Sequence, residues 1–258
     1  MLFYLRKSRL LRKLWHVPVT IPVKWDGTHF TIYADLFRNI NFVVHRRWLG
    51  ERDEQRTFAS LIKRYGVQSF WDVGANIGFY SLIFLQNNPQ GTVRAFEPDS
   101  RNLALLRKTQ KRNALAMTII DAAVGNKIGS APFYVDDITG ATGSLVESNF
   151  IQEQYGHGPP ERVVLTTTLD EQLKTGVPDF VKIDVEGADL EVLQGAATML
   201  KTYHPIVMFE ATATTWAQTS ALLKDNGYQL FSASTGQKLE DGTRSYNVLA
   251  LHNKHLAH

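Results

Sequence analysis

The feature that most constrains this chain is a glycine turn between an apolar strand and an apolar helix. Phe70 to Val73 has the composition of a short buried strand, Gly74 and Gly78 follow it, and an apolar helix begins at Phe79. Glycine adopts backbone angles that other residues avoid, and it lets a ligand approach the main chain closely. The first N–H groups of the helix then face that ligand. The stretch therefore predicts a unit that holds a nucleotide, with a plain turn that binds nothing as the alternative.

Strands and helices alternate through most of the chain, which predicts a parallel sheet covered by helices on both faces. Seven apolar, strand-length runs occur, near residues 70, 93, 118, 180, 206, 229 and 247. Turn residues at Gly236 and Asp241-Gly242 join the last two, so we expect an antiparallel last strand. Between the fourth and fifth runs, one helix is expected, with Leu190, Leu193, Ala197 and Leu200 on one face.

The pattern divides the chain into two parts. Residues 1–50 form an expected N-terminal extension, with short strands at 19–23 and 29–33 joined by a turn at Asp26-Gly27. Residues 51–258 form the main domain, which opens with a helix from 51 to 65. Residues 126–168 are glycine-rich and interrupt the alternation, so we expect a hairpin-like insertion there. Such insertions act as lids over a site or are simply surface loops.

Charge is concentrated at the N-terminus. The net charge is +3, and residues 1–16 contribute +5, which leaves −2 for residues 17–258. The main body therefore has no broad basic surface, and we expect no nucleic-acid partner. Residues 1–16 mix apolar and basic side chains, which favours either peripheral membrane contact or a helix packed on the domain. The chain has no cysteine and no long apolar span, which is consistent with a cytoplasmic protein.

Acidic residues follow the expected strands, at the sheet edge where parallel sheets bind ligands. Glu97 ends the second strand, where an acid commonly accepts hydrogen bonds from the ribose hydroxyls of a nucleoside. Asp121 ends the third strand and is expected to approach the adenine. Helix capping is the alternative for Glu97.

Three further acids end the next two strands, namely Asp184, Glu186 and Glu210. Acids beside the glycine turn fit either a cationic ligand or proton transfer, with helix capping as the alternative. His29 and Lys182 are more distant candidates for a base. Carboxylate oxygens also suit a hard divalent ion. The sequence has no close histidine pair of a metal-binding type, and we assign no metal.

Together these motifs resemble the FkbM family, a branch of the class I S-adenosylmethionine-dependent methyltransferases. The resemblance covers about residues 50–250 and rests on four stretches: 72–78, 96–98, 181–187 and 204–210. It implies a Rossmann-like α/β fold with a seven-stranded, mostly parallel sheet. It also implies O-methylation of sugars or polyketide-type products. The residues that it implies for binding S-adenosylmethionine are Asp72, Gly74, Asn76, Gly78 and Glu97.

We therefore expect an S-adenosylmethionine-dependent O-methyltransferase acting on a small-molecule or glycan acceptor. The sulfonium already activates the methyl group, so the protein must align an oxygen and remove its proton. Asp184, Glu186 and Glu210 are the candidates for that base. Two alternatives are a dinucleotide-dependent oxidoreductase and a non-catalytic nucleoside-binding protein on the same fold. The turn is Gly-x-x-x-Gly and lacks the middle glycine that a pyrophosphate requires, which disfavours the oxidoreductase.

Overall fold

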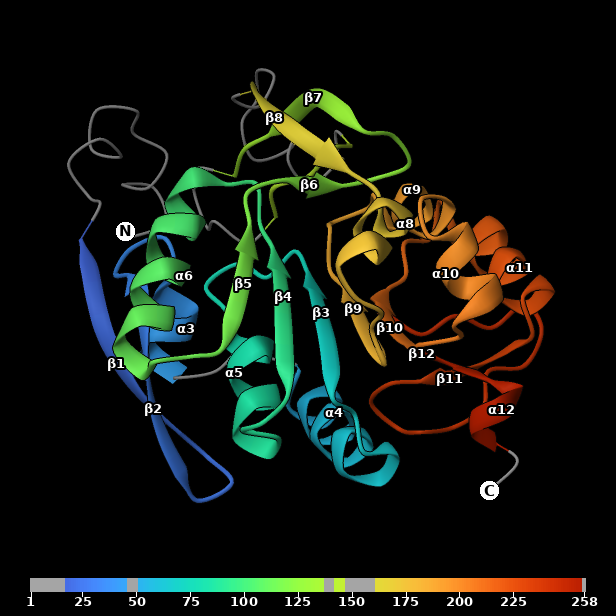
Figure 1. Ribbon diagram of the computed structural model, residues 1–258, viewed down its shortest axis with the longest axis horizontal. Helices are drawn as coiled ribbons and strands as arrows, with labels where there is room; N and C mark the ends of the chain where they lie inside the picture. The colour runs from blue at the N-terminus through green and yellow to red at the C-terminus, as the bar shows by residue number, and fades with distance from the viewer. Residues whose placement is uncertain (1–16, 46–50, 137–141, 147–160, 257–258) are drawn as a thin grey trace.

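The computed structural model describes residues 17–45, 51–136, 142–146 and 161–256. Its main sheet has seven strands in the order β11-β12-β10-β9-β3-β4-β5, and β12 alone runs opposite to the other six (Figure 1). The strands are β3 (Ser69–Val73), β4 (Thr92–Phe96), β5 (Met117–Ile120), β9 (Phe180–Ile183), β10 (Ile206–Glu210), β11 (Tyr228–Ser232) and β12 (Asn247–His252). The seven expected strands and the antiparallel last strand are therefore confirmed, as is the Rossmann-like α/β class.

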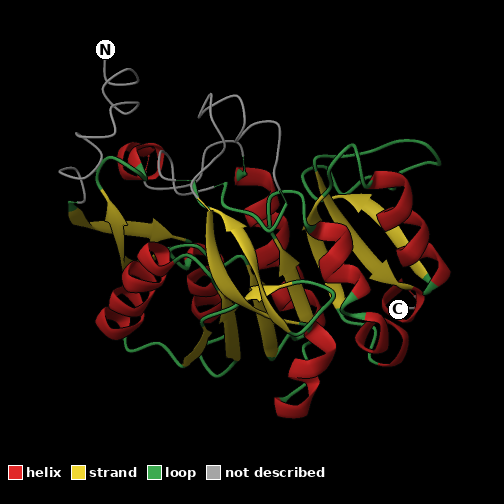
Figure 2. Cartoon of the chain, turned by 90° about the horizontal axis from the view of Figure 1, so that it is seen from above, coloured by secondary structure: helices red, strands yellow, loops and turns green. Residues whose placement is uncertain are grey.

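Helices cover both faces of this sheet (Figure 2). One face carries α4 (Arg52–Tyr65), α5 (Phe79–Asn87) and α6 (Ser100–Asn113). The other carries α8 (Leu169–Gln172), α9 (Asp189–Gln194), α10 (Ala197–Thr202) and α11 (Trp216–Asp225), with a 3₁₀ turn at Leu173–Thr175 after α8. Neighbouring strand residues alternate between two apolar cores: Phe70 belongs to the first and Trp71 to the second. A strand covered on both faces must be apolar throughout, which explains the continuous apolar runs in the sequence.

The N-terminal strands form a separate hairpin of β1 (Pro18–Trp25) and β2 (Thr28–Asp35), followed by α3 (Ile40–His45). Asp26 and Gly27 both have positive φ, as a tight two-residue hairpin turn requires. Side chains of α6 complete the free edge of β2, since Asn113 Oδ1 and Thr109 Oγ1 accept hydrogen bonds from its backbone at 3.0 Å. The two expected short strands are confirmed, and the hairpin is attached to the main sheet through α6.

The expected insertion contains β7 (Gly129–Tyr134) and β8 (Glu161–Thr167), which pair antiparallel, while β6 (Ala123–Val124) pairs with β8. Figure 1 places this small sheet beyond the carboxyl ends of β3, β4 and β5. Residues 1–16 and most of the loop between β7 and β8 lie outside the described residues. In the part that the structure describes, no helix has the length and apolar character to span a bilayer.

The single helix expected over residues 190–200 is wrong, because α9 and α10 are separate helices that meet at Gly195. A Cβ at Gly195 would lie 2.1 Å from the carbonyl oxygen of Gly125, so the small sheet approaches the main chain at this bend. The buried residues are Val192, Leu193, Met199 and Leu200, whereas Ala197 is exposed. A contact with a distant segment therefore overrides the local helical period.

Candidate functional site

The glycine turn joins β3 to α5, and both of its glycines have positive φ. Gly74 has φ +78°, and a Cβ there would lie 1.8 Å from the carbonyl oxygen of Asp184 on the neighbouring strand end. Gly78 has φ +88°, and a Cβ there would lie 2.5 Å from the Leu106 side chain on α6. The left-handed backbone angles expected at this glycine turn are confirmed, and the close approach at Gly74 is made by the backbone of Asp184.

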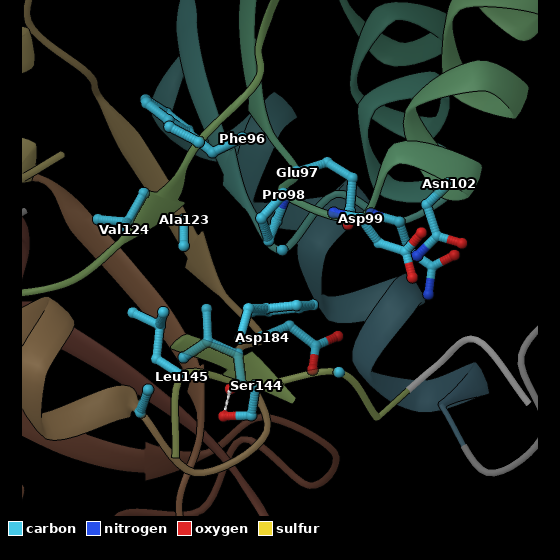
Figure 3. Close-up of a pocket in the computed structure, with 17 residues that line it drawn as sticks. Phe96, Glu97, Pro98, Asp99, Asn102, Ala123, Val124, Ser144, Leu145 and Asp184 are labelled. Atoms are coloured by element: carbon cyan, nitrogen blue, oxygen red, sulfur yellow. Dashed lines mark hydrogen bonds between the residues drawn. The ribbon is translucent and has the colours of Figure 1, made fainter. Parts of the chain in front are cut away.

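A cavity that we call the Glu97 cavity lies at the carboxyl ends of β3, β4 and β9 (Figure 3). The apolar part of its wall includes Phe96, Ala123, Val124 and Leu145. Its polar lining consists of Asn76, Glu97, Asp99, Asn102, Ser144 and Asp184. Ser144 and Leu145 come from the insertion, and Ser144 Oγ donates a hydrogen bond of 2.9 Å to the Val185 carbonyl. This described part of the insertion is thus fastened over the strand ends.

Glu97 is buried in this cavity, and both of its carboxyl oxygens accept backbone hydrogen bonds. Oε2 accepts from the Asn76 N–H and Oε1 from the Asp99 N–H, each at 2.8 Å. Burial, with the nearby charge of Asp99, raises the pKa of Glu97 to about 8. Beyond these two bonds the carboxyl group keeps lone pairs that a ligand hydroxyl can use, and with its raised pKa it also holds a proton below about pH 8. The turn and the strand end are therefore held together by the side chain that faces the cavity.

Arg38, on the segment between β2 and α3, supports the same wall. Its Nη2 lies 2.6 Å from Asp99 Oδ2, and it also donates to Asn102 Oδ1 and to the Asp136 carbonyl. Burial pushes the pKa of Asp99 upward, but Arg38 and the Arg101 N–H together hold it below its ordinary value. Arg38 escaped the sequence analysis, because an arginine in a loop 61 residues before its partner carries no local signal.

A second cavity, which we call the acidic cavity, adjoins the first. Gly74, Asn76 and Asp184 line both. Five carboxyl side chains line the acidic cavity: Glu51, Asp72, Asp184, Glu186 and Glu210. Lys182 is its one cationic lining residue among those described, and its Nζ lies 2.6 Å from Asp184 Oδ2 and 4.3 Å from the Tyr80 ring centre. The cavity therefore carries a marked excess of acidic groups.

Asp184, Glu186 and Glu210 each place a carboxylate oxygen within 4.8 Å of the other two. Burial, with the charge of Asp184, raises the pKa of Glu210 to about 7 despite a hydrogen bond from Tyr246. Burial and the charge of Glu210 also raise the pKa of Glu186 well above its ordinary value. Glu210 therefore exchanges a proton near neutral pH, as a general base must. The oxygens of the three acids are also close enough to share a divalent ion.

Asp72 lines the acidic cavity but is engaged by its own unit. Its Oδ2 accepts from the Ser81 N–H at 3.0 Å and from the Ser81 hydroxyl at 2.6 Å. Burial raises the pKa of Asp72, and the charge of Lys182 opposes that rise. Asp72 thus ties β3 to the first turns of α5 and leaves one carboxyl oxygen for the cavity.

The structure does not bring every expected residue to the cavities. Asp121 pairs with Arg107 at 3.4 Å, its side chain is 59% exposed, and the lining is formed by Ala122 and Ala123 in its place. Gly78 and His29 also line neither cavity. The approach of Asp121 to an adenine is therefore not seen here. The sequence predicts which residue follows the end of a strand, but it does not predict whether the side chain of that residue faces the cavity or the solvent.

Glu51 and Tyr80 are among the lining residues that the sequence did not predict. The Tyr80 hydroxyl donates to Glu51 Oε2 at 2.9 Å, and both face Lys182. Tyr80 could have been found, since it lies in the first turn of the helix that follows the glycine turn. Glu51 could not, because it precedes a helix that lies far from the strand ends in sequence.

A sequence model of the methyltransferase FkbM domain matches residues 72–230, which is more than half of the chain. The match contains the glycine turn, Glu97, the three clustered acids and most of the main sheet.

Two relatives and one solved structure are similar to the chain. Methyltransferase sdnD of Sordaria araneosa is 28% identical over 198 residues, 62% of this chain and 73% of that one. Hexuronic acid methyltransferase AglP of Haloferax volcanii is 28% identical over 141 residues, 54% of either chain. The crystal structure of methyltransferase FkbM from Methylobacillus flagellatus gives a TM-score of 0.51 at 19% identity, covering 83% of this chain and 52% of that one. The chain thus spans about half the length of the last two, and the structural likeness concerns the fold alone.

Proposed function

Since the chain belongs to the FkbM methyltransferase family, we propose that it transfers a methyl group from S-adenosylmethionine to a hydroxyl oxygen of a sugar or secondary-metabolite acceptor. The observation that supports this best is the wall shared by the two cavities. Gly74, Asn76 and Asp184 line both, where β3 and β9 end. A ligand held across this wall has one end at Glu97 and the other among the acids.

The Glu97 cavity suits the nucleoside part of S-adenosylmethionine. Glu97 has lone pairs free for the two ribose hydroxyls, and the apolar side chains around it suit a purine ring. Asn76, Asp99 and Asn102 add polar side chains to the lining of this cavity. The residues present therefore fit this half of the cofactor.

The acidic cavity suits the cationic part. When bound, S-adenosylmethionine supplies an activated methyl group on a positively charged sulfur. Five carboxyl groups against one lysine favour a cation over an anion at this end. Lys182 neutralises and positions Asp184, because it is buried beside it at 2.6 Å. Asp184 in turn stands on the wall that both cavities share.

The acid cluster supplies the proton acceptor. A hydroxyl oxygen becomes a good nucleophile when a positioned base removes its proton. Glu210 has a pKa of about 7 and faces the same cavity as Asp184 and Glu186, so it is our first choice. The proton released by the acceptor is held on this cluster and passes to solvent afterwards.

A dinucleotide fits these cavities less well. Lys182 is the one cationic side chain among the described residues that line them, and it is already paired with Asp184. The described lining therefore leaves no cation to receive a pyrophosphate. This observation disfavours the oxidoreductase alternative, as does the missing middle glycine.

Calorimetry with S-adenosylmethionine, S-adenosylhomocysteine and NAD tests the proposal directly. We expect both sulfur compounds to bind and NAD not to bind. A methyl-transfer assay with labelled S-adenosylmethionine and a panel of sugars, uronic acids and polyketides then tests catalysis. Binding of NAD in preference to S-adenosylmethionine would support the oxidoreductase. Tight cofactor binding without transfer to any acceptor class would support the non-catalytic alternative.

A further inference from the structure

A separate hollow, which we call the basic groove, lies between the β1–β2 hairpin and α4. Five side chains that carry or can carry positive charge line it: Lys24, His45, Arg52, Arg56 and Lys63. Asp26 is the one acidic lining residue among those described. The groove is thus opposite in charge to the acidic cavity. Cationic side chains are therefore concentrated in this groove.

Most of this positive charge is not neutralised within the protein. Lys63 pairs with Asp26 at 3.1 Å and Arg56 with Asp53 at 3.7 Å, and all four side chains are largely exposed. Exposed pairs of this kind are weak. Lys24 and Arg52 have no ion-pair partner in the part of the chain that the structure describes. The groove therefore presents at least two cations to a ligand.

Two buried polar side chains of the lining also have no hydrogen-bond partner. Gln55 is fully buried, and neither its Oε1 nor its Nε2 is bonded. The Nε1 of Trp25 is likewise buried and unbonded. Buried polar atoms without a partner are unfavourable and uncommon in folded proteins, so each one calls for an explanation. Gln55 and Trp25 both line the groove, so polar atoms without a partner lie next to its cations, and cationic side chains are the partners that an oxyanion prefers.

The basic groove adjoins the acidic cavity. Phe79 lines both, and Glu51 of the acidic cavity directly precedes Arg52 of the groove. An acceptor that carries a negative group cannot place it among five carboxyl groups. The groove offers such a group cationic side chains next to the acidic cavity.

We propose that the basic groove binds a phosphate or carboxylate group carried by the methyl acceptor. This inference rests on the proposed function for its link to methyl transfer. The groove's preference for an anion is independent of that link and can be measured by itself.

The indole N–H of Trp25 provides the direct probe. The chain has five tryptophans, and Trp25→Phe identifies the Trp25 resonance in a ¹⁵N correlation spectrum. The protein is titrated with pyrophosphate, with glucuronate and with neutral glucose. We expect a saturable shift of the Trp25 indole with at least one of the two anions and none with glucose. Pyrophosphate and glucuronate distinguish a phosphate site from a carboxylate site. Trp71, fully buried in the main sheet, is the internal reference.

A charge-reversal pair tests the groove residues. Lys24→Glu with Arg52→Glu should weaken anion binding at least about tenfold, since it removes two charge-assisted contacts and adds repulsion. The matched control is Lys127→Glu with Lys201→Glu, which makes the same change in net charge at exposed positions outside the groove. The control should keep the wild-type affinity. Arg52→Gln serves as a milder variant, and circular dichroism checks that each protein is folded.

Calorimetry with S-adenosylmethionine on the same proteins separates the two proposals. Both double variants should bind the cofactor as the wild type does, and S-adenosylhomocysteine should leave the anion-induced shift unchanged. If neither pyrophosphate nor glucuronate shifts the Trp25 indole resonance, the groove proposal is overturned. It is also overturned if the shift survives in the Lys24/Arg52 double variant, or if S-adenosylhomocysteine abolishes the shift. Failure of the wild type to bind S-adenosylmethionine would overturn the proposed function and leave an anion site standing.

Discussion

At the scale of single residues, the chemistry depends on carboxyl groups whose protonation is set by burial. Glu97 and Glu210 both lie at strand ends, yet their surroundings differ. Glu97 is buried and receives two backbone hydrogen bonds, whereas Glu210 stands beside two other acids. Their pKa values are raised to about 8 and about 7. The first side chain is suited to holding a ligand and the second to exchanging a proton.

Replacing Glu97 should alter the pH dependence of stability. Its folded pKa of about 8 lies above the ordinary 4.5, so the folded protein holds this proton more tightly than the unfolded chain does. Stability from this group is therefore complete below about pH 4.5 and declines as the pH rises to about 8. We expect Glu97→Gln to remove part of that decline, on the order of 1–3 kcal/mol.

Urea unfolding of the ligand-free protein at several pH values measures this effect. Glu210 and Glu186 contribute a slope of the same sign, so the comparison is between wild type and Glu97→Gln. Parallel stability curves for the two proteins would show that Glu97 does not titrate in this range. Glu97→Ala should also weaken S-adenosylmethionine binding by about 1–3 kcal/mol, which calorimetry checks.

Turnover should depend on the acid cluster. A base must be unprotonated to act, so the rate should rise with pH through about 7, the pKa of Glu210. The measured midpoint belongs to the coupled group and not to one residue. We compare Glu210→Gln, Asp184→Asn and Glu186→Gln. Replacement of the residue that acts as the base should lower turnover about 10²–10⁴-fold. The affinity of that variant for S-adenosylmethionine should change far less than its turnover.

Methyl transfer to an identified acceptor, run beside cofactor calorimetry, distinguishes the roles. A large loss of cofactor affinity would assign the altered residue to binding. Near-normal turnover in all three variants would remove the cluster from catalysis. Repeating the assay with EDTA and with added Mg²⁺ separates proton transfer from metal binding, because only a metal-dependent enzyme loses activity with the chelator and regains it with the ion.

At the scale of elements, the strand–turn–helix unit is built around close approaches. β9 comes so near to β3 at their carboxyl ends that no side chain fits at Gly74. This approach is also what sets Asp184 on the wall between the two cavities. The close approach of the Asp184 backbone to Gly74 therefore explains both why glycine is needed there and why Asp184 lines both cavities.

Gly74→Ala should destabilise the protein by several times more than a glycine substitution in open space. The added Cβ meets the Asp184 carbonyl at 1.8 Å, and backbone must move to relieve the contact. Gly236→Ala is the matched control, because Gly236 also has positive φ, at +71°, and has no atom within 4 Å of the added Cβ. The control should lose only about 1 kcal/mol, the strain of a left-handed alanine. Urea unfolding measures both, and equal losses would contradict the close approach.

At the scale of the whole molecule, charge is separated along the chain and over its surface. The acidic cavity and the basic groove share Phe79 in their lining, and residues 1–16, with five cations and no acid, precede both in sequence. Residues 1–16 lie outside the described residues, and peripheral membrane contact through them stays a prediction. It concerns where the enzyme works, whereas the groove concerns what it binds.

Binding to acidic liposomes tests the role of residues 1–16. Five positive charges should bring the protein to vesicles that contain phosphatidylserine, and added salt should release it because it screens the attraction. Deleting these residues should abolish sedimentation with the vesicles and leave S-adenosylmethionine affinity intact. A fall in melting temperature of many degrees, or loss of cofactor binding, would instead favour a helix packed on the domain.

Local pattern was sufficient to predict much of this protein. Apolar runs of strand length, the turn at Gly74 and the acids that end each strand depend only on neighbouring residues, because backbone geometry repeats over short distances. They predicted the seven strands, the antiparallel last one, and the presence of Glu97, Asp184, Glu186 and Glu210 near the ligand edge. The motifs also predicted the family, which the domain match over residues 72–230 confirms.

Tertiary structure decided what depends on partners far apart in sequence. Arg38 reaches Asp99, Gly195 bends the chain against Gly125, and Asp121 turns out to Arg107. The basic groove likewise exists only because the β1–β2 hairpin stands beside α4. The physical reason is the same in each case: a local pattern places a residue at a strand end or on a helix, but its side chain's direction, burial and charge follow from which elements pack against it.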